Sequence, residues 1–152
     1  MIAFGCTSGS FICPGDRIER TMHEATGAPA VTTAYSVLAA LKHMGITKLS
    51  MGTPYTNFVN EEEIAFLAKN GIEVVKLHSL QLGETQEERR SIGRVPPEAA
   101  YRMCRMIDHP DAQAIFLSCT NLATIEIIEE LERDLGKPVT PPIRRPSGVA
   151  CR

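Results

Sequence analysis

Short apolar runs alternate along this chain with longer segments of helical periodicity. The apolar runs predict strands at residues 2–6, 29–33, 48–53, 72–77, 114–119 and 137–140. The periodic segments predict helices at residues 14–25, 34–44, 60–70, 96–107 and 121–135. Regular alternation of strands and helices is typical of an α/β fold built on a mainly parallel sheet.

Polar residues predict the start of one helix and the position of one long loop. Asn60 is predicted as the N-cap of a helix, and the acidic residues 61–63 then fall in its first turn, where the helix dipole favours negative charge. Residues 81–94 are polar and charged, which predicts a long loop or flap. Within it, the charged run at 84–90 is interpreted as a solvated face.

Length and charge restrict the class of protein. The chain has 152 residues and a formal net charge of −2, with 43% hydrophobic and 22% charged residues. These values are ordinary for a globular domain, and the absence of a long basic run argues against nucleic acid or an anionic membrane as a partner. No apolar stretch reaches the roughly 18 residues of a membrane span, and no signal-type segment is visible. We therefore expect a cytoplasmic protein.

The five cysteines are odd in number and widely spaced, which favours reduced thiols over a disulfide framework. The sequence contains no C-x-x-C pair and no H-E-x-x-H motif, so a zinc site has no support. It contains no glycine-rich nucleotide motif either. We expect neither a metal nor an organic cofactor.

Two of the cysteines, Cys6 and Cys119, stand in similar surroundings. Each ends an apolar run, is followed by a threonine and a small polar residue, and precedes a segment that can be helical. Ligands bind at the carboxyl ends of parallel strands, and N–H groups at a helix start favour thiolate over thiol. The pair therefore suggests an acid/base site of two thiols. The alternative for each cysteine is a small buried apolar side chain at a strand end.

Polar neighbours of these strand ends are candidates for binding an anion. Tyr55 follows a predicted strand and either covers the edge of the core or donates a hydrogen bond to a substrate carboxylate. Backbone N–H groups in the two cysteine turns can meet anionic oxygens or take part in ordinary helix capping, and the two roles are compatible. The residues concerned are Thr7, Ser8, Thr120 and Asn121.

Four motifs occur in the order typical of one family. They are Phe-Gly-Cys-Thr-Ser-Gly-Ser from residue 4, Thr-Thr-Ala-Tyr-Ser from residue 32, Thr-Pro-Tyr from residue 53 and Ser-Cys-Thr-Asn-Leu from residue 118. With them, residues 2–139 resemble the maleate cis-trans isomerase and arylmalonate decarboxylase branch of the aspartate/glutamate racemase superfamily. The resemblance implies a three-layer α/β/α fold in which two pseudo-symmetric domains each contribute one cysteine. It also implies catalysis without a cofactor or metal.

The resemblance assigns roles to seven residues. Cys6 matches the first cysteine, a nucleophile, and Cys119 matches the second, which donates a proton or assists. Carboxylate binding is implied for Thr7, Ser8, Tyr55, Thr120 and Asn121. The implied reaction is isomerisation of a small dicarboxylate of the maleate-to-fumarate type, with an aspartate/glutamate-type amino-acid racemase as the alternative. The decarboxylases of the branch keep only the second cysteine, which argues against that activity here.

The resemblance also implies a domain organisation. Family members have further strands and helices before the first cysteine motif, so residues 1–30 are predicted to be a remnant of the first domain and residues 31–140 a near-complete second domain. A remnant of this kind suggests an alternative from another class, a non-catalytic or ligand-binding fragment. The implied partner is a small dicarboxylate or an amino acid, and assembly into a homo-oligomer is an option.

Residues 141–152 have neither a strand nor a helix pattern and are basic and rich in proline. The family continues here with a segment of the Thr-Ser-Asn-Gln-Ala type. One back-translation of residues 141–147, read two bases on, gives Ser-Asn-Gln-Ala-Ser-Glu. We therefore hypothesise that a frameshift created residues 141–152.

Overall fold

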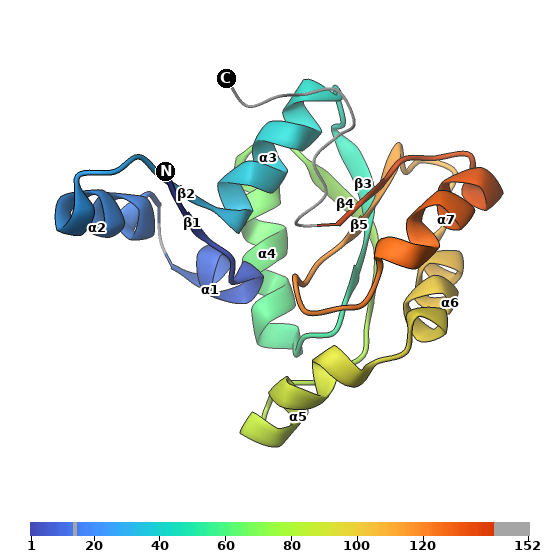
Figure 1. Ribbon diagram of the computed structural model, residues 1–152. Coiled ribbons are helices and arrows are strands. Elements are labelled where there is room, and N and C mark those ends of the chain that lie inside the picture. Colours follow the sequence, from blue (N-terminus) through green and yellow to red (C-terminus); the bar gives the residue numbers. More distant parts are fainter. Residues whose placement is uncertain (14, 142–152) are drawn as a thin grey trace.

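The computed structural model describes residues 1–13 and 15–141, and in this part of the chain it contains two sheets (Figure 1). The larger sheet has the strand order β4-β3-β5-β6, and the smaller sheet pairs β1 with β2. The strands are β1 Ile2–Phe4, β2 Ala30–Thr32, β3 Lys48–Thr53, β4 Glu73–Ser79, β5 Ala114–Leu117 and β6 Val139–Thr140. Every strand pairing within the described residues is parallel, which confirms the predicted α/β class. The tail that we predict to be frameshifted lies, from residue 142 onward, outside the described residues.

Helices cover both faces of the four-stranded sheet (Figure 1). The helices are α3 Thr33–His43 and α4 Asn57–Lys69 on one face, and α6 Pro97–Ile107 and α7 Ile128–Leu135 on the other. Ala114 and Phe116 of β5 pack in the core beneath α3 and α4, whereas Ile115 and Leu117 pack beneath α6 and α7. Because successive side chains of a strand point to opposite faces, one fully apolar strand fills both core layers. None of the described helices is both long and apolar enough to span a membrane.

The N-terminal segment joins the larger sheet through α1 Thr7–Ile12 and carries α2 Arg17–Thr26 on its outer side (Figure 1). Phe11 of α1 is buried in the core layer of α3 and α4, where its ring centroid lies 5.1 Å from that of Phe66 and 6.5 Å from that of Phe116. No residue of α2, all of which the structure describes, is buried. The domain boundary predicted at residue 30 falls within β2, and the division into domains stays a prediction.

Two helices occupy segments where the sequence analysis placed none. α1 contains two serines and a glycine, which are weak helix formers, and the burial of Phe11 stabilises it from outside. α5 Gln86–Ser91, continued by a 3-10 turn at Ile92–Arg94, replaces the predicted loop. It begins with a capping box between Thr85 and Glu88, a Thr-x-x-Glu signal that is visible in the sequence.

The N-cap predicted at Asn60 is wrong, because α4 starts earlier and its N-cap is Thr56. Asn60 instead lies inside the helix and is buried. Its Oδ1 accepts a hydrogen bond of 2.5 Å from the Thr53 hydroxyl, and its Nδ2 donates one of 3.2 Å to the Tyr55 carbonyl. The side chain thus fixes the loop that leaves β3 rather than the start of a helix.

α7 is shorter than the helix predicted at residues 121–135. A 3-10 turn at Ile125–Ile127 precedes it, and Ile128 is its first residue. The backbone N–H of Asn121 donates to the sulfur of Cys119 at 3.4 Å, so the chain turns back toward the end of β5 before the helix starts. The residues expected to begin the helix instead form part of the candidate site.

Candidate active site

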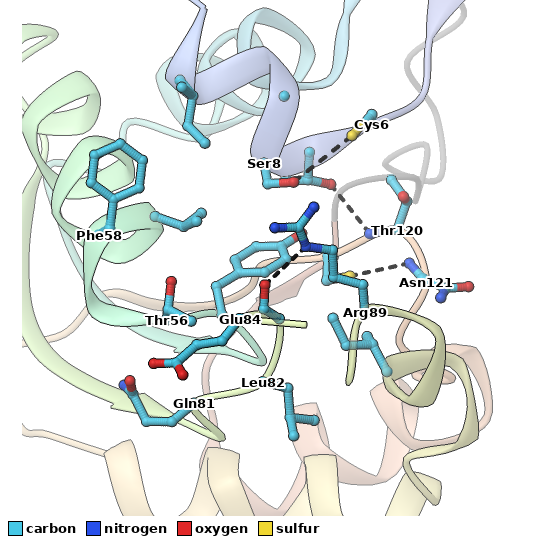
Figure 2. A pocket seen from close by; sticks show the side chains of 18 of the residues that line it. Cys6, Ser8, Thr56, Phe58, Gln81, Leu82, Glu84, Arg89, Thr120 and Asn121 are labelled. Carbon is cyan, nitrogen blue, oxygen red and sulfur yellow. Dashed lines mark hydrogen bonds between the residues drawn. The ribbon is translucent and has the colours of Figure 1, made fainter. Parts of the chain in front are cut away.

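All seven predicted site residues line one open cavity of about 850 Å³ (Figure 2). They are Cys6, Thr7, Ser8, Tyr55, Cys119, Thr120 and Asn121. Cys6 lies between β1 and α1, Thr7 and Ser8 are the first two residues of α1, the tyrosine follows β3, and the last three follow β5. The structure therefore brings together residues from three strand ends, where ligands bind in parallel sheets.

Two hydrogen bonds join the two cysteine turns directly. The backbone N–H of Thr120 donates to the hydroxyl of Thr7 at 3.2 Å, and the hydroxyl of Thr120 donates to the carbonyl of Gly5 at 2.9 Å (Figure 2 shows the first). Thr7 is 1% exposed, so this contact is shielded from water. The two threonines therefore hold the turns together, in addition to any role toward a ligand.

Cys6 lies between β1 and α1, with its side chain exposed to solvent. Its sulfur is 3.8 Å from the hydroxyl oxygen of Ser8. A Cβ atom on Gly9 would lie 3.2 Å from this sulfur and 3.3 Å from the ring of Phe4. The glycine thus leaves room for a thiol that a molecule in the cavity can reach.

Cys119 is buried, and its backbone conformation is unusual. It is 6% exposed and has a φ of 126°, in a region that residues with a side chain rarely adopt. Burial raises the pKa of the Cys119 thiol, while hydrogen bonds from Tyr55 and from the backbone N–H groups of Asn121 and Leu122 act in the opposite direction. Since the net shift is upward, Cys119 is a neutral thiol, able to donate a proton, near pH 7.

Tyr55 interacts with both cysteine turns. Burial raises the pKa of its phenol above the ordinary value, and the nearby Cys119 adds to this effect, whereas a hydrogen bond with Thr7 opposes it. The phenol therefore stays protonated and able to donate. Its backbone carbonyl accepts hydrogen bonds from the side chains of Asn60 and Ser79, which fix the position of the loop.

Glu63 of α4 lies behind the Cys119 turn and is a residue that sequence analysis did not assign to the site. Its side chain is fully buried, and the hydroxyl of Ser118 donates to its Oε1 at 2.8 Å. Its Oε2 has no hydrogen-bond partner among the described residues. Burial raises the pKa of Glu63 to about 8, so the carboxyl group is largely protonated at neutral pH. The prediction that Glu63 lies in the first turn of a helix is wrong, because α4 begins at Asn57, and the sequence carries no signal of this burial.

The remaining cavity wall combines apolar and charged side chains that sequence analysis also left outside the site. The apolar ones include Ile12, Phe58, Val59, Leu82 and Ile92, and the charged ones are Glu84 and Arg89. The charged pair comes from the segment predicted as a solvated loop, and the capping box of α5 was the available signal that this segment is ordered.

Comparison with protein families gives a match over almost the whole described chain. A family model described as arylmalonate decarboxylase matches residues 2–144. The arylmalonate decarboxylase of Bordetella bronchiseptica is 38% identical over 120 residues, which make up 78% of this chain and 48% of that protein. The chain thus spans about half the length of the curated relatives it matches.

Solved structures agree on the fold. A liganded mutant of arylmalonate decarboxylase, with one glycine changed to cysteine and one cysteine to serine, superposes with a TM-score of 0.84 at 31% identity, over 92% of this chain and 60% of that chain. A mutant of the maleate cis-trans isomerase of Nocardia farcinica with a covalently bound succinylcysteine intermediate gives 0.83 over 93% of this chain and 60% of that chain. At 22% identity, the second likeness shows the fold alone.

Proposed function

Because this chain belongs to the arylmalonate decarboxylase family, we propose that its cavity is the site of a cofactor-independent enzyme that isomerises a small dicarboxylate of the maleate type. The observation that carries this proposal is that Cys6 and Cys119 line one cavity, on two turns joined by the hydrogen bonds of Thr120. One thiol is open to the cavity and the other is buried and protonated. Two thiols in these states suit a nucleophile and a proton donor.

In the first step, the thiolate of Cys6 adds to one carbon of the double bond. A carbon–sulfur bond forms, and the π electron pair moves to the neighbouring carbon, where the adjacent carboxylate delocalises it. The thiol of Cys119 then gives its proton to that carbon, which leaves a saturated succinyl group on Cys6. The succinylcysteine in the Nocardia farcinica isomerase is an adduct of this type and supports such a step here.

The second half of the reaction reverses these bond changes after a rotation. In the saturated adduct the former double bond is a single bond, so the two carboxylates can turn from the same side to opposite sides. The thiolate of Cys119 takes a proton back, the double bond re-forms, and the carbon–sulfur bond to Cys6 breaks. The trans isomer leaves, and both cysteines return to their starting states.

Donors of the cavity wall bind the carboxylates in this proposal. The phenol of Tyr55 and the hydroxyl of Ser8 are donors at the cavity wall, as is the amide of Asn121. The N–H groups of Thr7 and Ser8 lie in the first turn of α1, where the helix provides no acceptor. Donors fixed before the reaction stabilise the charge that develops on the carboxylate during addition.

An assay of the full chain tests this proposal. Maleate should be converted to fumarate, as followed by proton NMR, and parallel incubations with L- and D-aspartate test the racemase alternative. Cys6→Ser should abolish conversion, and Cys119→Ser should slow it by roughly 10²–10⁴-fold, as for loss of a general acid. Cys13→Ser, at a partly buried position outside the cavity lining, is the control and should leave the rate unchanged.

A second readout separates this proposal from a non-catalytic fragment. Iodoacetamide should alkylate Cys6 faster than the buried Cys119, and maleate should protect Cys6. If no dicarboxylate or amino acid is converted and none protects Cys6, the isomerase and racemase hypotheses are both wrong, and the fragment alternative stands.

A further inference from the structure

The charged side chains of the cavity wall come from the segment that the sequence predicted as a solvated loop. Of the described residues that line the cavity, Arg89 alone carries a positive charge and Glu84 alone a negative one. Arg89 extends from α5 toward Ser8 in Figure 2, whereas the carboxylate of Glu84 points away, toward Thr56 and Gln81. The cationic group therefore lies on the side of the cavity where the Cys6 turn is found.

The side chain of Arg89 is anchored through one nitrogen and leaves the others available. Its Nε donates to the carbonyl of Gly83 at 2.8 Å. Within the part of the chain that the structure describes, no carboxylate lies within ion-pair distance of its guanidinium group. The two terminal nitrogens thus present a fork of N–H donors, which matches the geometry of a carboxylate.

The turn that anchors Arg89 is itself held rigidly. The carboxylate of Glu88 accepts hydrogen bonds from three successive backbone N–H groups, those of Gly83, Glu84 and Thr85, at 2.9–3.3 Å. These bonds, from Thr85 and Gly83 above all, lower the pKa of Glu88, so the carboxylate stays charged. Gly83 has a φ of 112°, a conformation suited to glycine. Arg89 bonds to the carbonyl of Gly83, and Glu88 bonds to the N–H of the same glycine. These two contacts fix the position of the guanidinium group.

We propose that Arg89 binds the second carboxylate of the substrate and makes the site select dicarboxylates over monocarboxylates. This inference rests on the proposed function, in which the first carboxylate is held by the donors around Tyr55 and Ser8. A fixed cation at a distance from the reacting carbon compensates the second negative charge without taking part in the bond changes. Arg89 is therefore a specificity-determining residue, and the charged run at 84–90 is part of the site.

Arg90 offers a matched control. It is the next residue of the same helix, is exposed, and does not line the cavity. Arg89→Met and Arg90→Met therefore remove the same charge from the same helix, and long-range electrostatic effects on an anionic substrate are similar in both. Any difference between the two variants comes from the contact that Arg89 makes in the cavity.

The experiment measures binding and turnover of maleate and of its monoamide, maleamate, by the full chain. Binding is measured as protection of Cys6 from iodoacetamide, and turnover by NMR. Arg89→Met should weaken protection by maleate roughly 10–100-fold, as expected for a charged hydrogen bond, and change protection by maleamate less than about threefold. Arg89→Lys should recover part of the loss, and Arg90→Met should stay near the unchanged protein for both compounds.

The outcomes separate this inference from the proposed function. Equal protection by maleate in Arg89→Met and Arg90→Met, or an equal loss for maleate and maleamate, overturns the role of Arg89 even if the isomerase is active. Protection that depends on Arg89 without conversion of maleate overturns the proposed reaction and leaves the dicarboxylate site standing. If the unchanged chain neither binds nor converts maleate, both are wrong.

Discussion

The turn that carries Cys119 is enclosed by the fold, whereas the turn that carries Cys6 lies at its surface. Cys119 follows β5, an inner strand of the four-stranded sheet, and helices cover that sheet on both faces. Cys6 follows β1, which pairs with β2 in a two-stranded sheet and has no fully buried residue. The two cysteines of one cavity thus depend on very different amounts of packing.

This difference matches the different tasks that the proposed mechanism gives to the two cysteines. A backbone conformation such as that of Cys119 costs free energy and persists only where the surroundings determine it, which the buried contact of Ser118 with Glu63 helps to do. Burial also keeps Cys119 protonated, as a proton donor must be. In the same proposal Cys6 meets the substrate, and exposure serves that purpose, although its position then relies on a few anchoring contacts.

Among these substitutions, the largest loss of stability is expected at Phe11, which anchors the segment around Cys6 to the core. Phe11→Ala removes a side chain that is 4% exposed and packs on the rings of Phe66 and Phe116, so the free energy of unfolding should fall by about 3–4 kcal/mol. Urea denaturation of the full chain measures this loss. Phe58→Ala, at a residue that is 61% exposed, is the control and should change the value by less than about 0.5 kcal/mol. Equal losses in the two variants would contradict the anchoring role.

Glu63, which lies behind the Cys119 turn, should make the free energy of unfolding depend on pH. Burial raises the pKa of Glu63 to about 8 in the folded chain, against an ordinary value of 4.5 in the unfolded chain. Between these pH values the folded chain keeps a proton that the unfolded chain releases. The free energy of unfolding should therefore fall as the pH rises from about 4.5 to about 8, by roughly a few kcal/mol, and then level off.

Two neutral variants isolate this contribution. Glu63→Gln removes the titrating group but keeps an acceptor for Ser118, so its stability should lack this fall with pH. Glu62→Gln, at the exposed neighbouring position, should keep the profile of the unchanged protein. Urea denaturation at several pH values between 4.5 and 8.5 makes the comparison, and parallel profiles for the two variants would show that Glu63 does not titrate as described.

Much of the fold follows from patterns that belong to single segments. The strands at 48–53 and 114–117 and the helix from residue 97 to 107 were predicted to within a few residues, because apolar runs and a proline-led start report local structure directly. α1 was missed because its stability comes from Phe11 packing on distant segments. α5 was missed although its capping box was readable, because the charge run was interpreted first.

The candidate site likewise contains residues that the sequence could predict and residues that it could not. Cys6 and Cys119 end predicted strands and Tyr55 follows one, and parallel topology places such residues at one edge, so their shared cavity could be predicted. The burial of Glu63 and the approach of Arg89 depend on how helices pack and turn in three dimensions. Charged residues in a charged run are ordinarily solvated, and the run that contains Arg89 was interpreted in this way.

The smallest effect on stability is expected at Gly9, where a substitution should instead change the reactivity of the exposed Cys6. In Gly9→Ala the new Cβ would lie 3.2 Å from the sulfur of Cys6 and 3.3 Å from the ring of Phe4, so the thiol must shift by a few tenths of an ångström. Alanine favours the helix by about 1 kcal/mol, which offsets part of the strain and keeps the free energy of unfolding within about 1 kcal/mol of the original. The measured quantity is the rate constant for alkylation of Cys6 by iodoacetamide, which should fall, while that of the enclosed Cys119 stays unchanged. Gly5→Ala, where a Cβ would meet nothing within 4 Å, is the control, and equal Cys6 rate constants in the two variants would mean that Gly9 does not set the position of the thiol.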